Sequence, residues 1–147
     1  MFQLIATIMT PEPLNDRICV ACDSSQISRR VLVKSAPEVL IIQLNRALPD
    51  GTKDSTIVDF PSVLSLPCRK HGQVQPVAYD LHSVICHQGN SSVRGHYFTY
   101  ANRDGKWYLF NDEKVTAIPP NLVDSSISTK QAYMYVFEKL GSFEPRL

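Results

Sequence analysis

Alternating polar and apolar positions, rich in β-branched and aromatic residues, predict β-strands along most of the chain. The run at residues 38–46 follows Pro37 directly, as strands often follow a proline, and contains Val, Leu and Ile in succession. The other predicted strands span residues 56–60, 77–87, 96–103, 106–111, 114–118 and 132–139. We therefore expect a mainly β fold built around one antiparallel sheet.

Turn-forming residues separate the predicted strands. Leu-Pro-Asp-Gly at 48–51, Arg-Lys-His-Gly at 69–72 and the Gly- and Ser-rich stretch 88–95 are predicted loops. Helix signals are weak, and the Ser and Thr content of residues 121–130 favours a loop there. The pattern thus predicts no long helix.

Composition narrows the class of protein. A chain of 147 residues suits one domain, and its net charge of +1 gives no electrostatic reason to bind nucleic acid or a membrane surface. No apolar stretch is long enough for a membrane span. Residues 1–9 are apolar but lack a basic region before them, so we expect a truncated strand or helix end instead of a signal peptide. These features predict an intracellular protein, cytoplasmic and/or nuclear, whose four cysteines are thiols or metal ligands.

The dipeptide Asp104-Gly105, between two aromatic-rich runs, predicts a tight hairpin. Asp-Gly favours a type I′ turn because both central residues need a positive φ. With these two residues as the loop, Arg103 faces Lys106, and the pairing of the whole hairpin is fixed.

This register places His96 and Asn111 on one face of the hairpin. They are diagonal neighbours, roughly 7–8 Å apart at the backbone, a gap that two polar side chains can span. Asp112 falls on the opposite face, so the geometry favours Asn111 as the direct partner of the imidazole. A bulge near residue 112 would reverse that preference.

A histidine held by an amide or a carboxylate is the base that a thiol nucleophile requires. The base takes the thiol proton, and its partner fixes the tautomer and the ring orientation. Gly95 before the histidine would let a substrate backbone approach closely. Without further information, the residues favour the plainer alternative, a surface-strand histidine beside the core residues Trp107 and Phe110.

The chain resembles a known family over several segments in a fixed order. These are Cys19-Val-Ala-Cys22, residues 36–46, residues 58–61, residues 79–89, the stretch 95–112 that begins Gly95-His96-Tyr97, and residues 132–137. Together they resemble the C-terminal half of the catalytic domain of ubiquitin-specific proteases, which are papain-like cysteine deubiquitinases. The resemblance implies the antiparallel palm and fingers part of an α+β domain, with the helical thumb missing. It places a partial catalytic domain at residues 19–140, a truncated segment at 1–18 and a C-terminal tail at 141–147.

The implied activity is hydrolysis of the bond after ubiquitin's C-terminal glycine by a thiolate. His96 corresponds to the general base and Asn111 to the third catalytic position, while Asp112 is similar to a residue with a supporting role. The residues implied at the channel for ubiquitin's tail are His87, Gly95 and Tyr97. Expected partners are ubiquitin or ubiquitinated proteins, with no nucleic acid and no membrane.

The sequence departs from the family in its cysteines. The family's cysteine box near the start of the domain has no counterpart here, and Cys68 is expected in a loop with no helix after it to lower its pKa. Cys86 looks like a packing residue in a strand. We therefore expect this chain alone to be inactive, and a second chain could supply the half that carries the cysteine box.

The pair Cys19 and Cys22 has the spacing of half a tetrahedral zinc site. Catalysis of this type needs no cofactor, and a structural zinc would require a second cysteine pair from elsewhere. We expect the half-site to hold no metal by itself.

Two other functions remain open at this stage. The chain could be a catalytically dead adaptor that still binds ubiquitin, or a gene fragment without independent function.

Overall fold

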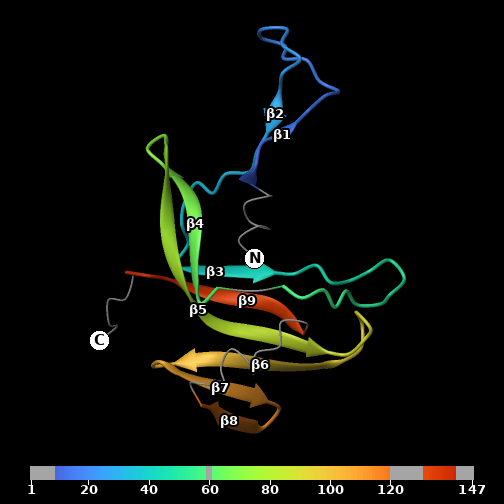
Figure 1. Ribbon diagram of the computed structural model, residues 1–147, viewed down its shortest axis with the longest axis vertical. Coiled ribbons are helices and arrows are strands. Elements are labelled where there is room, and N and C mark those ends of the chain that lie inside the picture. Colours follow the sequence, from blue (N-terminus) through green and yellow to red (C-terminus); the bar gives the residue numbers. More distant parts are fainter. Residues whose placement is uncertain (1–8, 59–60, 120–130, 142–147) are drawn as a thin grey trace.

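The computed structural model describes residues 9–58, 61–119 and 131–141, and these form an antiparallel β structure with almost no helix (Figure 1). The strands are β1 (Glu12–Pro13), β2 (Ser28–Arg29), β3 (Val39–Gln43), β4 (Val63–Lys70), β5 (Gln73–Gln88), β6 (His96–Arg103), β7 (Lys106–Asn111), β8 (Lys114–Ile118) and β9 (Ala132–Lys139). The larger sheet has the order β3-β9-β5-β6-β7-β8, and β4 also pairs with β5. The predicted fold class is confirmed.

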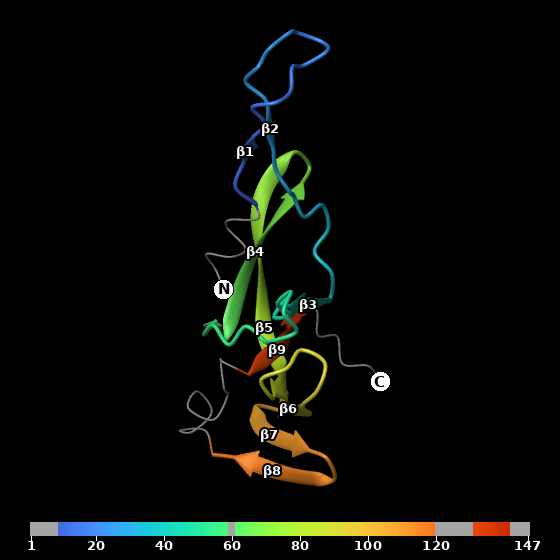
Figure 2. The same cartoon turned by 90° about the vertical axis from the view of Figure 1, so that its right-hand side faces the viewer.

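The long strand β5 joins two parts of the molecule. Its first half forms a hairpin with β4, and its second half lies between β9 and β6 in the main sheet. The short ribbon of β1 and β2 lies at one end of the molecule, and the β6–β8 meander lies at the other (Figure 2). Among the described residues, no helix has the length and hydropathy of a membrane span.

The β6–β7 hairpin has the predicted register. Asp104 and Gly105 have φ values of 51° and 77°, as a type I′ turn requires. Paired positions run from Arg103 opposite Lys106 to Thr99 opposite Phe110. The turn therefore sets which side chains of β6 and β7 share a face.

The main error of the sequence prediction lies before β5. Residues 56–58 of the predicted strand 56–60 are not in a strand, and residues 59–60 lie outside the described residues. The strand before β5 is β4, at Val63–Lys70. The sequence prediction missed it because Pro67 lies within it. Pro67 faces Pro76 across the β4–β5 pair, so two residues without an N–H share one position of the ladder.

Two consequences follow for neighbouring predictions. Cys68 lies inside β4 and not in a loop, and β5 begins at Gln73 instead of residue 77. The predicted loop at 121–130, residues 1–8 of the N-terminal segment and residues 142–147 of the tail lie outside the described residues.

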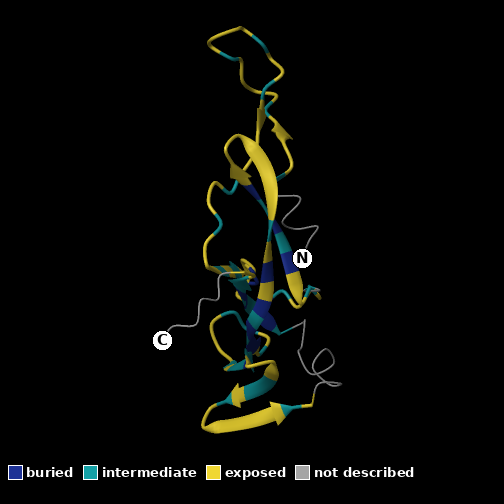
Figure 3. Ribbon diagram, turned by 90° about the vertical axis from the view of Figure 1, so that its left-hand side faces the viewer, coloured by how far each residue is buried: buried dark blue, intermediate teal, exposed yellow. Residues whose placement is uncertain are grey.

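The core forms where β4, β5 and β9 come together (Figure 3). Its largest fully buried apolar side chains are Tyr79, Tyr135, Phe137 and Leu64. The hydroxyl of Tyr135 donates to the carbonyl of Val58, so the segment before β4 is attached to the sheet. β8 is largely exposed by comparison.

Candidate active site

His96 and Asn111 meet at the open end of the β6–β7 hairpin. His96 is the first residue of β6 and Asn111 the last of β7, and the paired ladder stops at Thr99 and Phe110. The imidazole Nε2 lies 2.5 Å from the Asn111 Oδ1. Because a carbonyl oxygen can only accept, Nε2 donates, and Nδ1 carries the free lone pair. Asn111 is the partner that the hairpin register predicts.

Asp112 contributes less to this pair. Its carboxylate Oδ2 lies 3.9 Å from Nε2, and its side chain is 78% exposed at the turn into β8. At that exposure, solvent screens most of the attraction between the two groups.

Aromatic rings support His96 from along the same face of β6. Its ring stacks with Phe98 at a centroid distance of 6.4 Å and an interplanar angle of 22°, and Phe98 meets Tyr100 edge-on at 5.7 Å. The His96 side chain is 41% exposed, and within the described residues its Nδ1 has no hydrogen-bond partner. The arrangement thus presents an oriented proton acceptor to an incoming group.

The predicted tail-binding residues His87 and Tyr97 lie on the other face of the sheet. Their rings are 4.6 Å apart, and both contact Tyr133 of β9. Tyr97 is 54% exposed, whereas His87 is only 2% exposed. His87 is therefore a buried packing residue beneath Tyr97 and Tyr133 and has no surface for a ligand. The exposed ring of Tyr97 has such a surface.

Gly95 is exposed and immediately precedes His96 and Tyr97, whose side chains lie on opposite faces of the sheet. A Cβ at this position would overlap the His87 imidazole and the carbonyl oxygen of Gln88. Only glycine fits here, so the buried ring of His87 fixes the path of the backbone as it enters β6. Burial, followed by the nearby Lys53 cation, lowers the pKa of His87 and keeps this ring neutral.

Sequence reasoning missed two buried cations beside this loop. Arg46 is 2% exposed and donates to the carbonyls of Ala132, Asp54 and Thr56. Lys53 is 8% exposed, and its ammonium donates to the carbonyl of His87. Loop lysines are almost always exposed, so nothing in the sequence singles out Lys53.

Neither of the buried cysteines is suited to be the nucleophile. Cys86 lies on the His96 face of β5 and opposite Phe98, but it is fully buried, and burial raises its pKa to about 12. Roughly one thiol in 10⁵ would be ionised at neutral pH. Cys68 is 4% exposed, and burial raises its pKa too.

Cys19 and Cys22 lie between β1 and β2, at the end of the molecule away from β6–β8 (Figure 1). The backbone N–H of Ala21 and the Cys22 thiol lower the pKa of Cys19 by hydrogen bonding, as suits a metal-binding thiolate. The described residues contain no group of three or more candidate ligands. A tetrahedral zinc needs four ligands, so this pair does not complete a site within the described chain.

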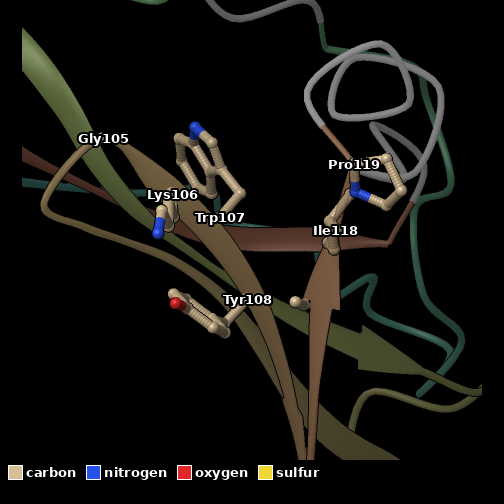
Figure 4. A pocket seen from close by; sticks show the side chains of 7 residues that line it. Gly105, Lys106, Trp107, Tyr108, Ile118 and Pro119 are labelled. Atoms are coloured by element: carbon tan, nitrogen blue, oxygen red, sulfur yellow. The ribbon is translucent and has the colours of Figure 1, made fainter.

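Two cavities lined by described residues lie at the other end of the hairpin. One of about 500 Å³ is lined by Gly105, Lys106, Trp107, Tyr108, Ala117, Ile118 and Pro119 (Figure 4). A second, of about 430 Å³, includes Arg103 and Asp104. Both adjoin the β6–β7 turn, a whole strand length from His96 and Asn111, and neither belongs to the candidate site.

Comparisons with known proteins agree with the fold. Residues 3–137 match the family described as ubiquitin carboxyl-terminal hydrolase. Human ubiquitin carboxyl-terminal hydrolase 17 is 29% identical over 149 aligned residues, which cover 97% of this chain, and zebrafish ubiquitin carboxyl-terminal hydrolase 48 is 33% identical over 69% of it. Among solved structures, a SAGA deubiquitinating module of Ubp8, Sgf11, Sus1 and Sgf73 bound to monoubiquitin superposes on 95% of the chain, with 26% identity and a TM-score of 0.76.

The match is to part of each relative. The chain covers 27% of the human protein, 10% of the zebrafish protein and 32% of the matched chain in the SAGA module.

Proposed function

Because the chain belongs to the ubiquitin carboxyl-terminal hydrolase family, we propose that it provides the general-base half of a thiol-dependent hydrolase that cleaves the bond after ubiquitin's C-terminal glycine. The observation that carries the proposal is the hydrogen bond from His96 Nε2 to Asn111 Oδ1 at the open end of the hairpin. It leaves Nδ1 as the proton acceptor.

The reaction follows from that tautomer. The thiol gives its proton to Nδ1 of His96, and the thiolate attacks the carbonyl carbon of ubiquitin's terminal glycine. The tetrahedral intermediate collapses as the imidazolium returns the proton to the leaving amine, which departs and leaves a thioester. His96 then takes a proton from water, the hydroxide attacks the thioester, and the thiol is released with that proton. Asn111 keeps the ring oriented through both half-reactions.

Gly95 and Tyr97 are the residues we assign to the tail of ubiquitin. Gly95 is exposed, so an extended peptide can reach its backbone, while the space of its missing Cβ is filled by the His87 ring. The exposed ring of Tyr97 flanks that backbone on the second face. His87 acts indirectly, because its buried ring determines where Gly95 lies.

The nucleophile would come from a polypeptide outside these 147 residues. Cys68 and Cys86 are buried with raised pKa values, and Cys19 and Cys22 lie beyond the β1–β2 ribbon. The relatives are about three times as long as this chain or longer, which is consistent with a further segment that supplies the thiol.

Joining the two halves tests the proposal. The chain would be mixed or fused with the cysteine-containing region of a related hydrolase, and cleavage of a fluorogenic ubiquitin C-terminal amide would be followed. We expect neither half to cleave alone and the joined protein to cleave, with loss of activity when the supplied cysteine is replaced by Ala. A joined protein that is folded and binds ubiquitin, yet shows no cleavage, would refute the proposal.

The inaccessible thiols favour a second candidate, a ubiquitin-binding adaptor without catalysis. This candidate predicts that the chain binds ubiquitin with an affinity that His96→Ala leaves unchanged, and that the joined protein stays inactive. The joining experiment therefore separates the two functions.

A further inference from the structure

Two loops lie against each other beside Gly95 and are cross-linked by several contacts. We define them as loop 47–54 and loop 89–95. The backbone N–H of Lys53 donates to the carbonyl of Asn90 at 3.0 Å, and the N–H of Ser92 donates to the carbonyl of Gly51 at 3.2 Å. Thr52 and Ser91 form an isolated antiparallel bridge. The loops, which are separated in sequence by β4 and β5, thus behave as one folded unit.

Lys53 adds a charged contact between loop 47–54 and the end of β5. Its Nζ lies 2.5 Å from the carbonyl oxygen of His87, and the residue is 8% exposed. Within the described part of the chain no carboxylate forms an ion pair with it, and burial is the first cause of its lowered pKa, with Arg46 the second. A buried ammonium is costly unless it is hydrogen-bonded, and the carbonyl of His87 is the acceptor that offsets part of this cost for Lys53.

The contact leads directly to the candidate site. The Lys53 ammonium donates a hydrogen bond to the backbone carbonyl of His87. The His87 ring in turn occupies the space in which a Gly95 side chain would lie. Gly89 also has little room, because a Cβ there would lie 2.9 Å from the Arg94 carbonyl oxygen. Loop 89–95 is therefore closely packed between His87 and its own backbone, and a shift of His87 would move Gly95.

We propose that Lys53 is a positioning residue that couples loop 47–54 to loop 89–95 and so holds Gly95 in the place where the tail of ubiquitin would bind. The identity of the ligand rests on the function proposed above. The coupling itself rests on the hydrogen bonds of Lys53 and on the packing of His87 against Gly95.

The hydrogen bond between His96 and Asn111 does not involve Lys53 or His87. The relative position of the imidazole and the amide follows from the Asp104-Gly105 turn and from the β6–β7 pairing. Loss of the Lys53 ammonium should therefore weaken tail binding and leave proton transfer intact. In the joined hydrolase, Lys53→Met is expected to raise KM about tenfold with kcat within about twofold of native, because one hydrogen bond to a charged group is lost.

The primary experiment uses the intact 147-residue chain and amide hydrogen exchange by NMR. Lys53→Met keeps the length of the side chain and removes its donors, and Lys70→Met, at an exposed position of β4, is the matched control. We expect exchange at the Lys53 and Ser92 amides to accelerate about tenfold or more in Lys53→Met, with the β3–β9 ladder unchanged and Lys70→Met like native. Native-like exchange of loop 89–95 in a folded Lys53→Met protein would overturn the proposal.

A measurement on the native chain covers the case in which Lys53→Met does not fold. If the loops are coupled, the protection factors of the Lys53 and Ser92 amides should agree within about threefold in the absence of urea, since one local opening exposes both. Clearly different values would overturn the coupling. A titration with ubiquitin keeps the two proposals apart: absence of binding by the native chain counts against the proposed function, while the exchange data still decide the role of Lys53.

Discussion

His96→Ala is expected to lower kcat of the joined hydrolase by about 10³-fold or more, because the thiol then loses the group that accepts its proton. The substitution removes a ring that is 41% exposed and whose only polar contacts in the described chain are with Asn111 and, weakly, Asp112. Stability should therefore change little. Single-turnover cleavage of the fluorogenic ubiquitin substrate measures the effect, and His71→Ala, at the exposed β4–β5 turn, is the control.

The same assay ranks the two groups beside the histidine. Asn111→Ala frees the ring to rotate, and a misplaced base should cost about 10²-fold in kcat. Asp112→Ala should cost less than about threefold, since the carboxylate is 3.9 Å away and mostly exposed. A larger loss for Asp112→Ala than for Asn111→Ala would show that the carboxylate orients the base.

Arg46→Met is expected to destabilise the folded chain by about 3–5 kcal/mol, the largest effect on stability that we predict. The guanidinium is 2% exposed and donates to the carbonyls of Ala132, Asp54 and Thr56, which would be left buried without these donors. Its hydrogen bonds also connect the segment before β4 to the start of β9. Both segments should therefore become less stable in Arg46→Met.

Urea unfolding, followed through the fluorescence of the single tryptophan, Trp107, measures this loss. The matched control is Arg29→Met, which removes an ion pair with Glu12 whose side chains are 70% and 63% exposed, and it should leave the unfolding midpoint unchanged. An Arg46→Met midpoint equal to that of the control would mean that the three carbonyl contacts contribute little.

The part of the site that sequence could predict was the part fixed by local chemistry. Asp104-Gly105 requires two positive φ values, and the resulting turn sets the register of β6 and β7. Once that register is known, the period of two along a strand places His96 and Asn111 on one face. The contact between them follows from the eight residues of β6 and the six residues of β7 on either side of one turn.

The rest of the site depends on contacts between distant segments, for which a single sequence gives no local signal. Lys53 and His87 are 34 positions apart, and their contact arises because loop 47–54 folds over the end of β5. Nothing in the loop distinguishes a buried lysine from a solvated one. The burial of His87, which changes its role from a ligand contact to a support for Gly95, was hidden for the same reason.

The missed strand β4 has a different cause. Leu64, Leu66 and Cys68 alternate with less buried residues and carry the period of a strand, but Pro67 lies among them. A proline usually argues against a paired strand, because it cannot donate to the ladder. Here Pro67 and Pro76 face each other at a position where the N–H groups point away from the partner strand, as the Arg69 N–H does toward Val33, so the β4–β5 ladder loses no hydrogen bond.

Gly95 lies where the residues of the two faces of the sheet come close to one another. His96 and Asn111 lie on the face that also carries Phe98 and Tyr100, whereas His87 and Tyr97 lie on the other. A peptide that passes Gly95 would meet the base on one side and an aromatic ring on the other. The base and the tail-binding surface can therefore be altered separately, which is why His96 and Lys53 substitutions should affect kcat and KM respectively.

We expect Asn111 to hold His96 in the tautomer that leaves Nδ1 free to accept a proton. ¹⁵N NMR of the imidazole in the intact chain, at a pH where the ring is neutral, tests it most directly. We predict protonated Nε2 and unprotonated Nδ1 in the native chain, with a return to the mixed tautomers of a free imidazole in Asn111→Ala. A native spectrum with the proton on Nδ1, or one that Asn111→Ala leaves unchanged, would contradict this role of Asn111.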